Sequence, residues 1–105
     1  GVPDNAGVIQ RRTKEMTDPI LLPKVQGTIV LDTLFAERAL DFFILFSSIG
    51  NYIYGRKFGQ VGYNAANEFL DAFAAYRLQK RAGYTASINW NDWAEVGMSV
   101  TAMEK

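Results

Sequence analysis

The sequence of 105 residues contains no cysteine and no histidine. Without these residues the chain can form no disulfide, no thiolate nucleophile and no Cys/His zinc site, and we predict no metal centre. A Ser-His-Asp or Cys-His catalytic arrangement within the chain is excluded for the same reason. Any catalysis is therefore left to Ser, Tyr, Lys, Asp, Glu and Asn side chains and to backbone groups.

An excess of charge of one sign is also missing, because eleven Lys and Arg side chains balance eleven Asp and Glu side chains. A neutral chain argues against a nucleic-acid partner or an anionic membrane surface. No apolar run approaches the ~18 residues of a membrane span. Residues 1–5 have neither the basic nor the apolar region of a signal peptide. We therefore expect a soluble cytoplasmic protein.

Apolar residues make up 49% of the sequence, which is enough for a packed core. Residues 1–16 are polar and predict a loop. Thr17-Asp18-Pro19 is typical of a helix start, with a capping side chain and a proline in the first turn. Apolar residues at helical spacing predict a helix over residues 17–39, with a kink or a new start at Pro23.

The centre of the chain predicts strand, helix and strand. The apolar run over residues 42–46 is typical of a strand buried on both faces of a parallel sheet. An Ala-rich helix over residues 60–82 follows and ends before Gly83, and residues 86–90 predict a second strand. This helix is predicted to place two sets of residues on opposite faces: Ala66, Leu70, Phe73 and Arg77 on one, and Glu68, Asp71, Ala75 and Gln79 on the other. The pattern predicts a βαβ unit with parallel strands.

Polar residues follow both predicted strands and begin the helix between them. Open parallel sheets bind ligands beyond the carboxyl ends of their strands. Ser47-Ser48, Tyr63 and Asn91-Asp92-Trp93 all belong to that edge, and Asn67 shares a helix face with Tyr63. Each also has an ordinary structural interpretation: serine commonly ends strands, Tyr63 could be an interfacial aromatic, and Asn67 a surface or capping amide.

A Ser after a buried strand, a Tyr at the next helix start and a Lys one helix upstream favour carbonyl reduction when taken together. Tyrosine has an ordinary pKa of ~10, and a nearby ammonium group such as that of Lys24 stabilises its phenolate form. A serine hydroxyl can bind the carbonyl oxygen whose negative charge grows as hydride arrives. The glycines of the chain form no G-x-G-x-x-G phosphate loop between a strand and a helix.

The sequence resembles the ketoreductase domain of modular polyketide synthases, a branch of the short-chain dehydrogenase/reductase family. The matching segments run in the family's order through almost the whole chain: Pro23-Lys24-Val25-Gln26-Gly27-Thr28, Phe42-Phe43-Ile44-Leu45-Phe46-Ser47-Ser48, Gly59-Gln60-Val61-Gly62-Tyr63-Asn64-Ala65-Ala66-Asn67, Phe69-Leu70-Asp71, Ser87-Ile88-Asn89-Trp90 and Trp93-Ala94-Glu95-Val96-Gly97-Met98. Each segment is weakly specific alone, and the conjunction is highly specific.

The resemblance implies NADPH-dependent reduction of a β-ketoacyl thioester, carried on the phosphopantetheine of an acyl carrier protein, within a polyketide or fatty-acid-type synthase. By resemblance, Tyr63 is the proton donor, Ser48 polarises the carbonyl, Lys24 supports the tyrosine and Asn67 completes the tetrad. It also implies cofactor contacts for three residues and substrate contacts for three more. The former are Tyr63, Lys24 and Asn91; the latter are Gln60, Trp93 and Met98. Residues 91–105 resemble the start of the substrate-covering region.

The family's glycine-rich loop has no counterpart in this sequence. We therefore expect residues 1–105 to be the carboxyl-terminal catalytic half of a Rossmann-type, doubly wound α/β domain. Its partners would be the upstream half of the same domain and neighbouring synthase domains, and the chain alone would be inactive. The alternative is a non-catalytic structural or interaction domain of reductase ancestry.

Overall fold

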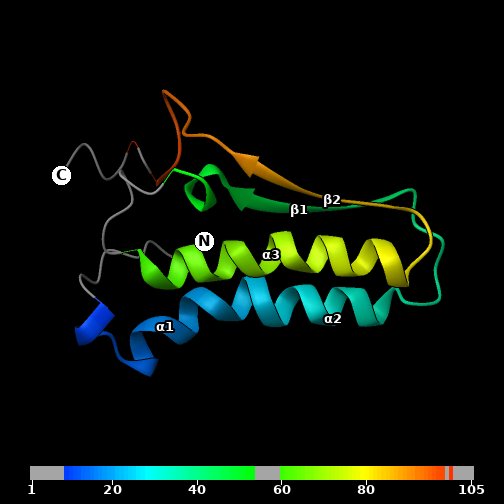
Figure 1. Ribbon diagram of the computed structural model, residues 1–105, viewed down its shortest axis with the longest axis horizontal. Helices are drawn as coiled ribbons and strands as arrows, with labels where there is room; N and C mark the ends of the chain where they lie inside the picture. The colour runs from blue at the N-terminus through cyan, green and yellow to red at the C-terminus, as the bar shows by residue number, and fades with distance from the viewer. Residues whose placement is uncertain (1–8, 54–59, 99, 101–105) are drawn as a thin grey trace.

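The computed structural model describes residues 9–53, 60–98 and 100. Its elements, in chain order, are η1 (Ile9–Arg11), α1 (Lys14–Leu21), η2 (Leu22–Gln26), α2 (Gly27–Leu34), β1 (Phe42–Ser48), η3 (Ile49–Asn51), α3 (Val61–Lys80) and β2 (Tyr84–Trp90). The two strands pair in parallel, with Phe42 opposite Tyr84 and Ser48 opposite Trp90 (Figure 1). The predicted βαβ unit and partial Rossmann-type fold are therefore confirmed.

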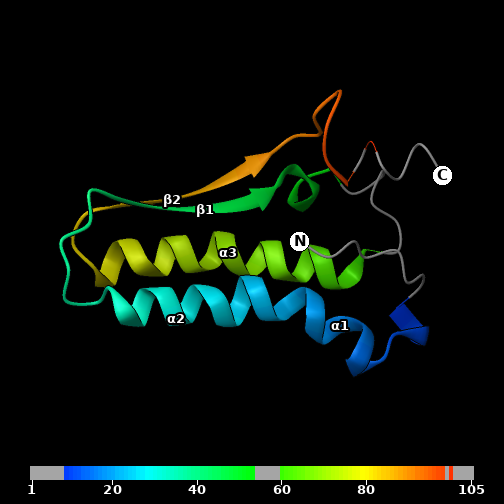
Figure 2. The same cartoon turned by 180° about the vertical axis from the view of Figure 1, so that it is seen from behind.

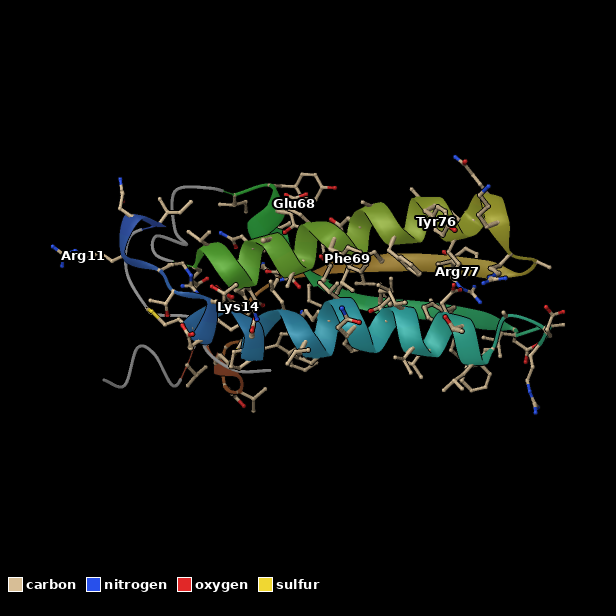
Figure 3. The ribbon with its side chains drawn as sticks, turned by 90° about the horizontal axis from the view of Figure 1, so that it is seen from below. Arg11, Lys14, Glu68, Phe69, Tyr76 and Arg77 are labelled. Atoms are coloured by element: carbon tan, nitrogen blue, oxygen red, sulfur yellow. The ribbon has the colours of Figure 1, made fainter. Side chains whose placement is uncertain are left out.

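All three α-helices lie on one side of the two-stranded sheet (Figures 1 and 2). The core lies between β1 and α3, where Phe43 and Leu45 pack with Leu70 and Ala74. Seen from below, α2 and α3 lie side by side under the strands (Figure 3). This arrangement brings the start of α3 and the η2 segment to the carboxyl ends of the strands.

The opposite face of the sheet is exposed over the described part of the chain. Phe42, Phe46 and Tyr84 project there and are 66%, 63% and 61% exposed. The expectation that the first strand is buried on both faces was therefore wrong for this chain. The reason is the alternation of side chains along a strand: every second residue of β1 points away from the helices, and no described helix covers that face.

The first helix begins earlier than the sequence predicts. Thr13 is its N-cap, and the Thr13 Oγ1 accepts a hydrogen bond from the Met16 N–H at 3.3 Å. Pro19 therefore lies inside α1 rather than in its first turn. The predicted loop over residues 1–16 was wrong from Ile9 onward, where η1 and then α1 form; residues 1–8 lie outside the described part of the chain.

The single helix predicted over residues 17–39 is interrupted at Pro23 and ends at Leu34. The interruption is η2, a five-residue π-helical turn in which the Gly27 N–H reaches back to the Leu22 carbonyl. A proline removes one backbone donor and crowds the preceding turn. A π-helical turn accommodates the proline, so that the chain continues as a helix into α2. Lys24 is the residue that this turn presents.

The second half of the unit follows its predicted pattern with shifted boundaries. The helix predicted over residues 60–82 spans Val61–Lys80, and the strands predicted over residues 42–46 and 86–90 span Phe42–Ser48 and Tyr84–Trp90. Gly83 joins α3 to β2 with a φ of +92°, and a Cβ there would lie 2.7 Å from the Leu40 carbonyl oxygen. Within residues 9–53 and 60–98, no helix is long and apolar enough to cross a membrane.

Candidate active site

Lys24, Asn67 and Tyr63 meet at the carboxyl edge of the sheet. The Lys24 Nζ donates hydrogen bonds to the Asn67 Oδ1 at 2.5 Å and to the Phe46 carbonyl oxygen at 3.0 Å. The same ammonium lies 5.3 Å from the centre of the Tyr63 ring. A residue from η2, two from α3 and the backbone of β1 thus form one cluster, although they are far apart in sequence.

Burial changes the properties of two side chains in this cluster, Lys24 and Asn67. Burial lowers the pKa of the Lys24 ammonium, because removal from water disfavours its charged form. Asn67 is completely buried, and its Nδ2 has no hydrogen-bond partner among the described residues. An unpaired buried donor costs stability, so it is a place where a water or a ligand atom would bind. The interpretation of Asn67 as a surface or capping amide was wrong, because Asn67 is buried inside α3 and caps neither of its ends.

Ser48 ends β1 with its side chain buried. The Gly50 N–H donates to the Ser48 Oγ at 3.1 Å, which makes Ser48 the N-cap of η3. A hydroxyl that accepts one hydrogen bond still has its own O–H to donate. Ser48 is connected to the Lys24 cluster through its neighbour, because the Ser47 Oγ donates to the Asn67 carbonyl oxygen at 3.1 Å.

Asp71 lies one helical turn beyond Asn67 and collects three hydrogen bonds. The Ser87 Oγ donates to its Oδ1 at 2.6 Å, and the Nδ2 atoms of Asn51 and Asn89 donate to its Oδ2 at 2.6 and 2.8 Å. The prediction that Asp71 lies on the helix face opposite the core was wrong. The spacing Tyr63, Asn67, Asp71, which repeats every four residues, is the signal that could have placed it with the site.

The charge of Asp71 is stabilised by these donors. Burial alone raises the pKa of its carboxyl group. The hydrogen bonds outweigh burial and hold the pKa below its usual value. Asp71 is therefore a carboxylate at neutral pH, and this negative charge lies under the carboxyl ends of both strands.

A second ionic cluster lies at the far end of α3 (Figure 3). Arg77 is only 2% exposed; its Nε donates to the Asp32 Oδ1 at 2.8 Å and its Nη1 to the Thr85 Oγ1 at 2.7 Å. Arg81 also binds Asp32, and the Arg77 guanidinium lies 4.1 Å from the centre of the Phe43 ring. Arg77 does lie on the inner helix face, but as a charged link between α2, α3 and β2, which the sequence did not predict.

The other predicted ligand contacts lie around the same edge. Gln60 precedes α3 and is partly buried, with an Oε1 that has no partner among the described residues. Asn91 follows β2, and its Oδ1 accepts a hydrogen bond from the Asp92 N–H at 2.8 Å. Trp93 and Met98 are exposed, and the Trp93 ring lies 6.2 Å from that of Trp90. These assignments stay predictions; residues 99 and 101–105 of the expected substrate-covering region lie outside the described part.

The chain matches known proteins over nearly its whole length. Among the curated relatives, the polyketide synthase PksN of Bacillus subtilis (strain 168) is 43% identical over 108 residues, which cover 93% of this chain and 2% of that protein. The 6-methylsalicylic acid synthase of Aspergillus terreus is 38% identical over 106 residues, which cover 96% of this chain and 6% of that protein.

Solved structures indicate the same family as these sequence relatives. The structure described as A-type ketoreductases from a modular polyketide synthase superposes with a TM-score of 0.82 and 35% identity, covering 93% of this chain and 20% of that chain. An N-terminal ketoreductase from the macrolactin assembly line superposes with a TM-score of 0.73 and 40% identity. This chain therefore spans about a fifth of the length of these ketoreductases. Since residues 3–95 also match the family model described as KR domain, the chain belongs to the ketoreductase domain family of polyketide synthases.

Proposed function

We propose that this chain supplies the catalytic side chains for NADPH-dependent reduction of a β-ketoacyl thioester to its β-hydroxyacyl product. The observation that carries this proposal is the Lys24 ammonium, which is bonded to Asn67 and lies 5.3 Å from the centre of the Tyr63 ring. A half-buried cation beside a tyrosine at the carboxyl edge of a parallel sheet suits proton transfer to a carbonyl oxygen. Family membership supports the same reaction class.

Each side chain of the cluster has a distinct role in the proposed reaction. The Tyr63 hydroxyl donates a proton to the substrate carbonyl oxygen, and the Ser48 O–H binds the same oxygen and stabilises its developing negative charge. The Lys24 ammonium stabilises the tyrosinate that remains after the proton has moved. Asn67 fixes the position of the ammonium through its Oδ1.

The polar groups at this edge fit a cofactor rich in hydroxyl groups. Two of the three Lys24 N–H donors are used by Asn67 and Phe46, and the Asn67 Nδ2 has no partner among the described residues. Tyr63, Lys24 and Asn91 would hold the nicotinamide end of NADPH, which supplies the hydride when bound. We assign the binding of the cofactor phosphates to sequence beyond these 105 residues, because the chain contains no glycine-rich phosphate loop.

The proposed partners follow from the length of the match. The chain spans a fifth of the solved ketoreductases, so we assign it a role within a larger domain and expect the isolated chain to be inactive. The substrate would be presented by an acyl carrier protein, with Gln60, Trp93 and Met98 near the acyl chain. A non-catalytic interaction domain is the alternative, and the buried, unpaired Asn67 Nδ2 argues against it because it costs stability without a structural benefit.

The direct test uses the complete ketoreductase domain that contains this chain. With NADPH and a β-ketoacyl thioester, the domain should oxidise NADPH and form one β-hydroxyacyl product per cofactor, measured by absorbance and by mass spectrometry. The substrate should be offered both as a small thioester and on an acyl carrier protein. A folded domain that binds NADPH but reduces neither the small thioester nor the carrier-bound substrate would instead support the non-catalytic alternative.

A further inference from the structure

Asp71 joins three elements beneath the proposed active site. It belongs to α3, and its Oδ2 accepts the Nδ2 donors of Asn51, at the end of η3, and Asn89, in β2. Ser87 of β2 occupies its other oxygen. A partly buried carboxylate with donors on both oxygens is fixed in one orientation and holds its donors in turn.

The two asparagine amides bridge Asp71 to the end of β1. The Nδ2 atoms of Asn51 and Asn89 lie 3.1 and 3.3 Å from the Ser47 Oγ, and the Asn89 Nδ2 lies 3.2 Å from the Ser48 carbonyl oxygen. The Ser47 hydroxyl then donates its own proton to the Asn67 carbonyl oxygen, 3.1 Å away. We call Asp71, Asn51, Asn89 and Ser47 the clamp.

We propose that Asp71 is a positioning residue that, through the clamp, fixes the Ser48 hydroxyl relative to Tyr63 and Lys24. This inference rests on the proposed function for its catalytic consequence. Its structural part does not: the clamp ties the Ser47-Ser48 end of β1 to the α3 turn that carries Asn67. Tyr63 lies on the same helix, one turn before Asn67.

The position of the Ser48 Oγ depends on this clamp because Ser48 caps η3. The Gly50 N–H donates to the Ser48 Oγ, and Asn51 is the last residue of the same short turn. Releasing Asn51 from Asp71 would let η3 shift, and the Ser48 hydroxyl would shift with it. A displacement of about 1 Å of a group that orients the reacting atoms can cost about 100-fold in rate.

The clamp depends on the acceptor oxygens of Asp71. Two N–H donors converge on the Asp71 Oδ2, and the Ser87 hydroxyl donates to its Oδ1. An Asp71→Asn side chain could still accept both amides through its oxygen and donate its NH2 group to the Ser87 hydroxyl, which also accepts. Asp71→Leu has a similar shape and no acceptor, so it should release Asn51 and Asn89 without creating a cavity.

The test compares two serine-to-alanine variants in the complete domain. Ser47→Ala removes the hydroxyl inside the clamp, whereas the matched control Ser87→Ala removes a donor to the same carboxylate outside it. We expect Ser47→Ala and Asp71→Leu to lower kcat by about 10- to 100-fold, with the KM for the thioester within about 3-fold of the wild-type value. Ser87→Ala should keep kcat within about 3-fold of the wild-type value.

Hydrogen exchange at the Gly50 amide provides a readout that does not depend on activity. The exchange rate should increase about 10-fold or more in Ser47→Ala and Asp71→Leu and stay at the wild-type value in Ser87→Ala, because the Gly50 N–H bonds to Ser48. The proposal is overturned if either folded clamp variant keeps both the wild-type kcat and the wild-type exchange rate, or if Ser87→Ala changes them as much. If the wild-type domain reduces no ketone, the proposed function fails, and the exchange rates alone decide on the clamp.

Discussion

The Tyr63→Phe variant of the complete ketoreductase domain should reduce its ketone at least about 100-fold more slowly than the wild type. General acid catalysis by a positioned side chain contributes about 10²- to 10⁴-fold, and phenylalanine removes the only proton that Tyr63 can donate. The loss should fall on kcat rather than on KM, because the hydroxyl acts in the transition state. Single-turnover kinetics with saturating NADPH would measure it.

Cofactor binding gives the control for this variant. The Phe ring keeps the shape of the tyrosine beside the Lys24 ammonium, and the other two proposed nicotinamide contacts, Lys24 and Asn91, keep their side chains. The Kd for NADPH, measured by fluorescence titration, should therefore stay within about 3-fold of the wild-type value, about 0.7 kcal/mol or less. Near-normal turnover in Tyr63→Phe would refute its role as the proton donor.

Asp32→Asn should lower the free energy of unfolding of the domain by about 3–5 kcal/mol at pH 7, the usual cost of leaving a buried charge without its partner. Arg77 is 2% exposed and depends on Asp32 for its ion pair at 2.8 Å. Urea unfolding followed by circular dichroism would measure the change. Asp18→Asn is the matched control, because the Lys14–Asp18 pair is exposed and such pairs contribute about 0–1 kcal/mol.

The effect of Asp32→Asn should also depend on pH. Burial alone raises the pKa of Asp32, but hydrogen bonds and charge attraction from Arg81 and Arg77 outweigh it and hold the pKa below its usual value. A lowered folded pKa stabilises the fold above the unfolded pKa of about 3.9, and this stability is lost as the pH falls through the folded pKa. The difference between wild type and variant should shrink below pH ~4 and not before.

The sequence predicts the framework of this fold well because its signals are local. The apolar run that forms β1, the Ala-rich α3 and the positive-φ Gly83 each act over a few residues, and together they specify a βαβ unit. The start of α1 was placed wrongly because Thr13 and Thr17 both resemble caps, and only the fold determines which one is used. The π-helical turn that presents Lys24 has no sequence signal beyond Pro23.

The site was predictable only in part, because its contacts join elements that are far apart in the sequence. Tyr63 and Asn67 were singled out by their place at the sheet edge and Lys24 by its conjunction with the tyrosine, the family resemblance assigned their roles, and the structure brings the three side chains together. Asp71 and the Asp32–Arg77 pair were not singled out, because their partners come from elements far away in the sequence. The spacing and the types of residues show that a helix face is polar, but they do not show which strand or turn will form hydrogen bonds with that face.

The most direct test of the Lys24–Tyr63 cluster as one catalytic unit is a double-mutant cycle with Lys24→Met and Tyr63→Phe in the complete domain. Residues that act as a unit are strongly non-additive, so the double variant should be about as slow as the slower single variant. Lys14→Met, which changes an exposed lysine on α1, should leave kcat unchanged. Losses that multiply in the double variant would show that Lys24 and Tyr63 act independently and would contradict the proposed mechanism.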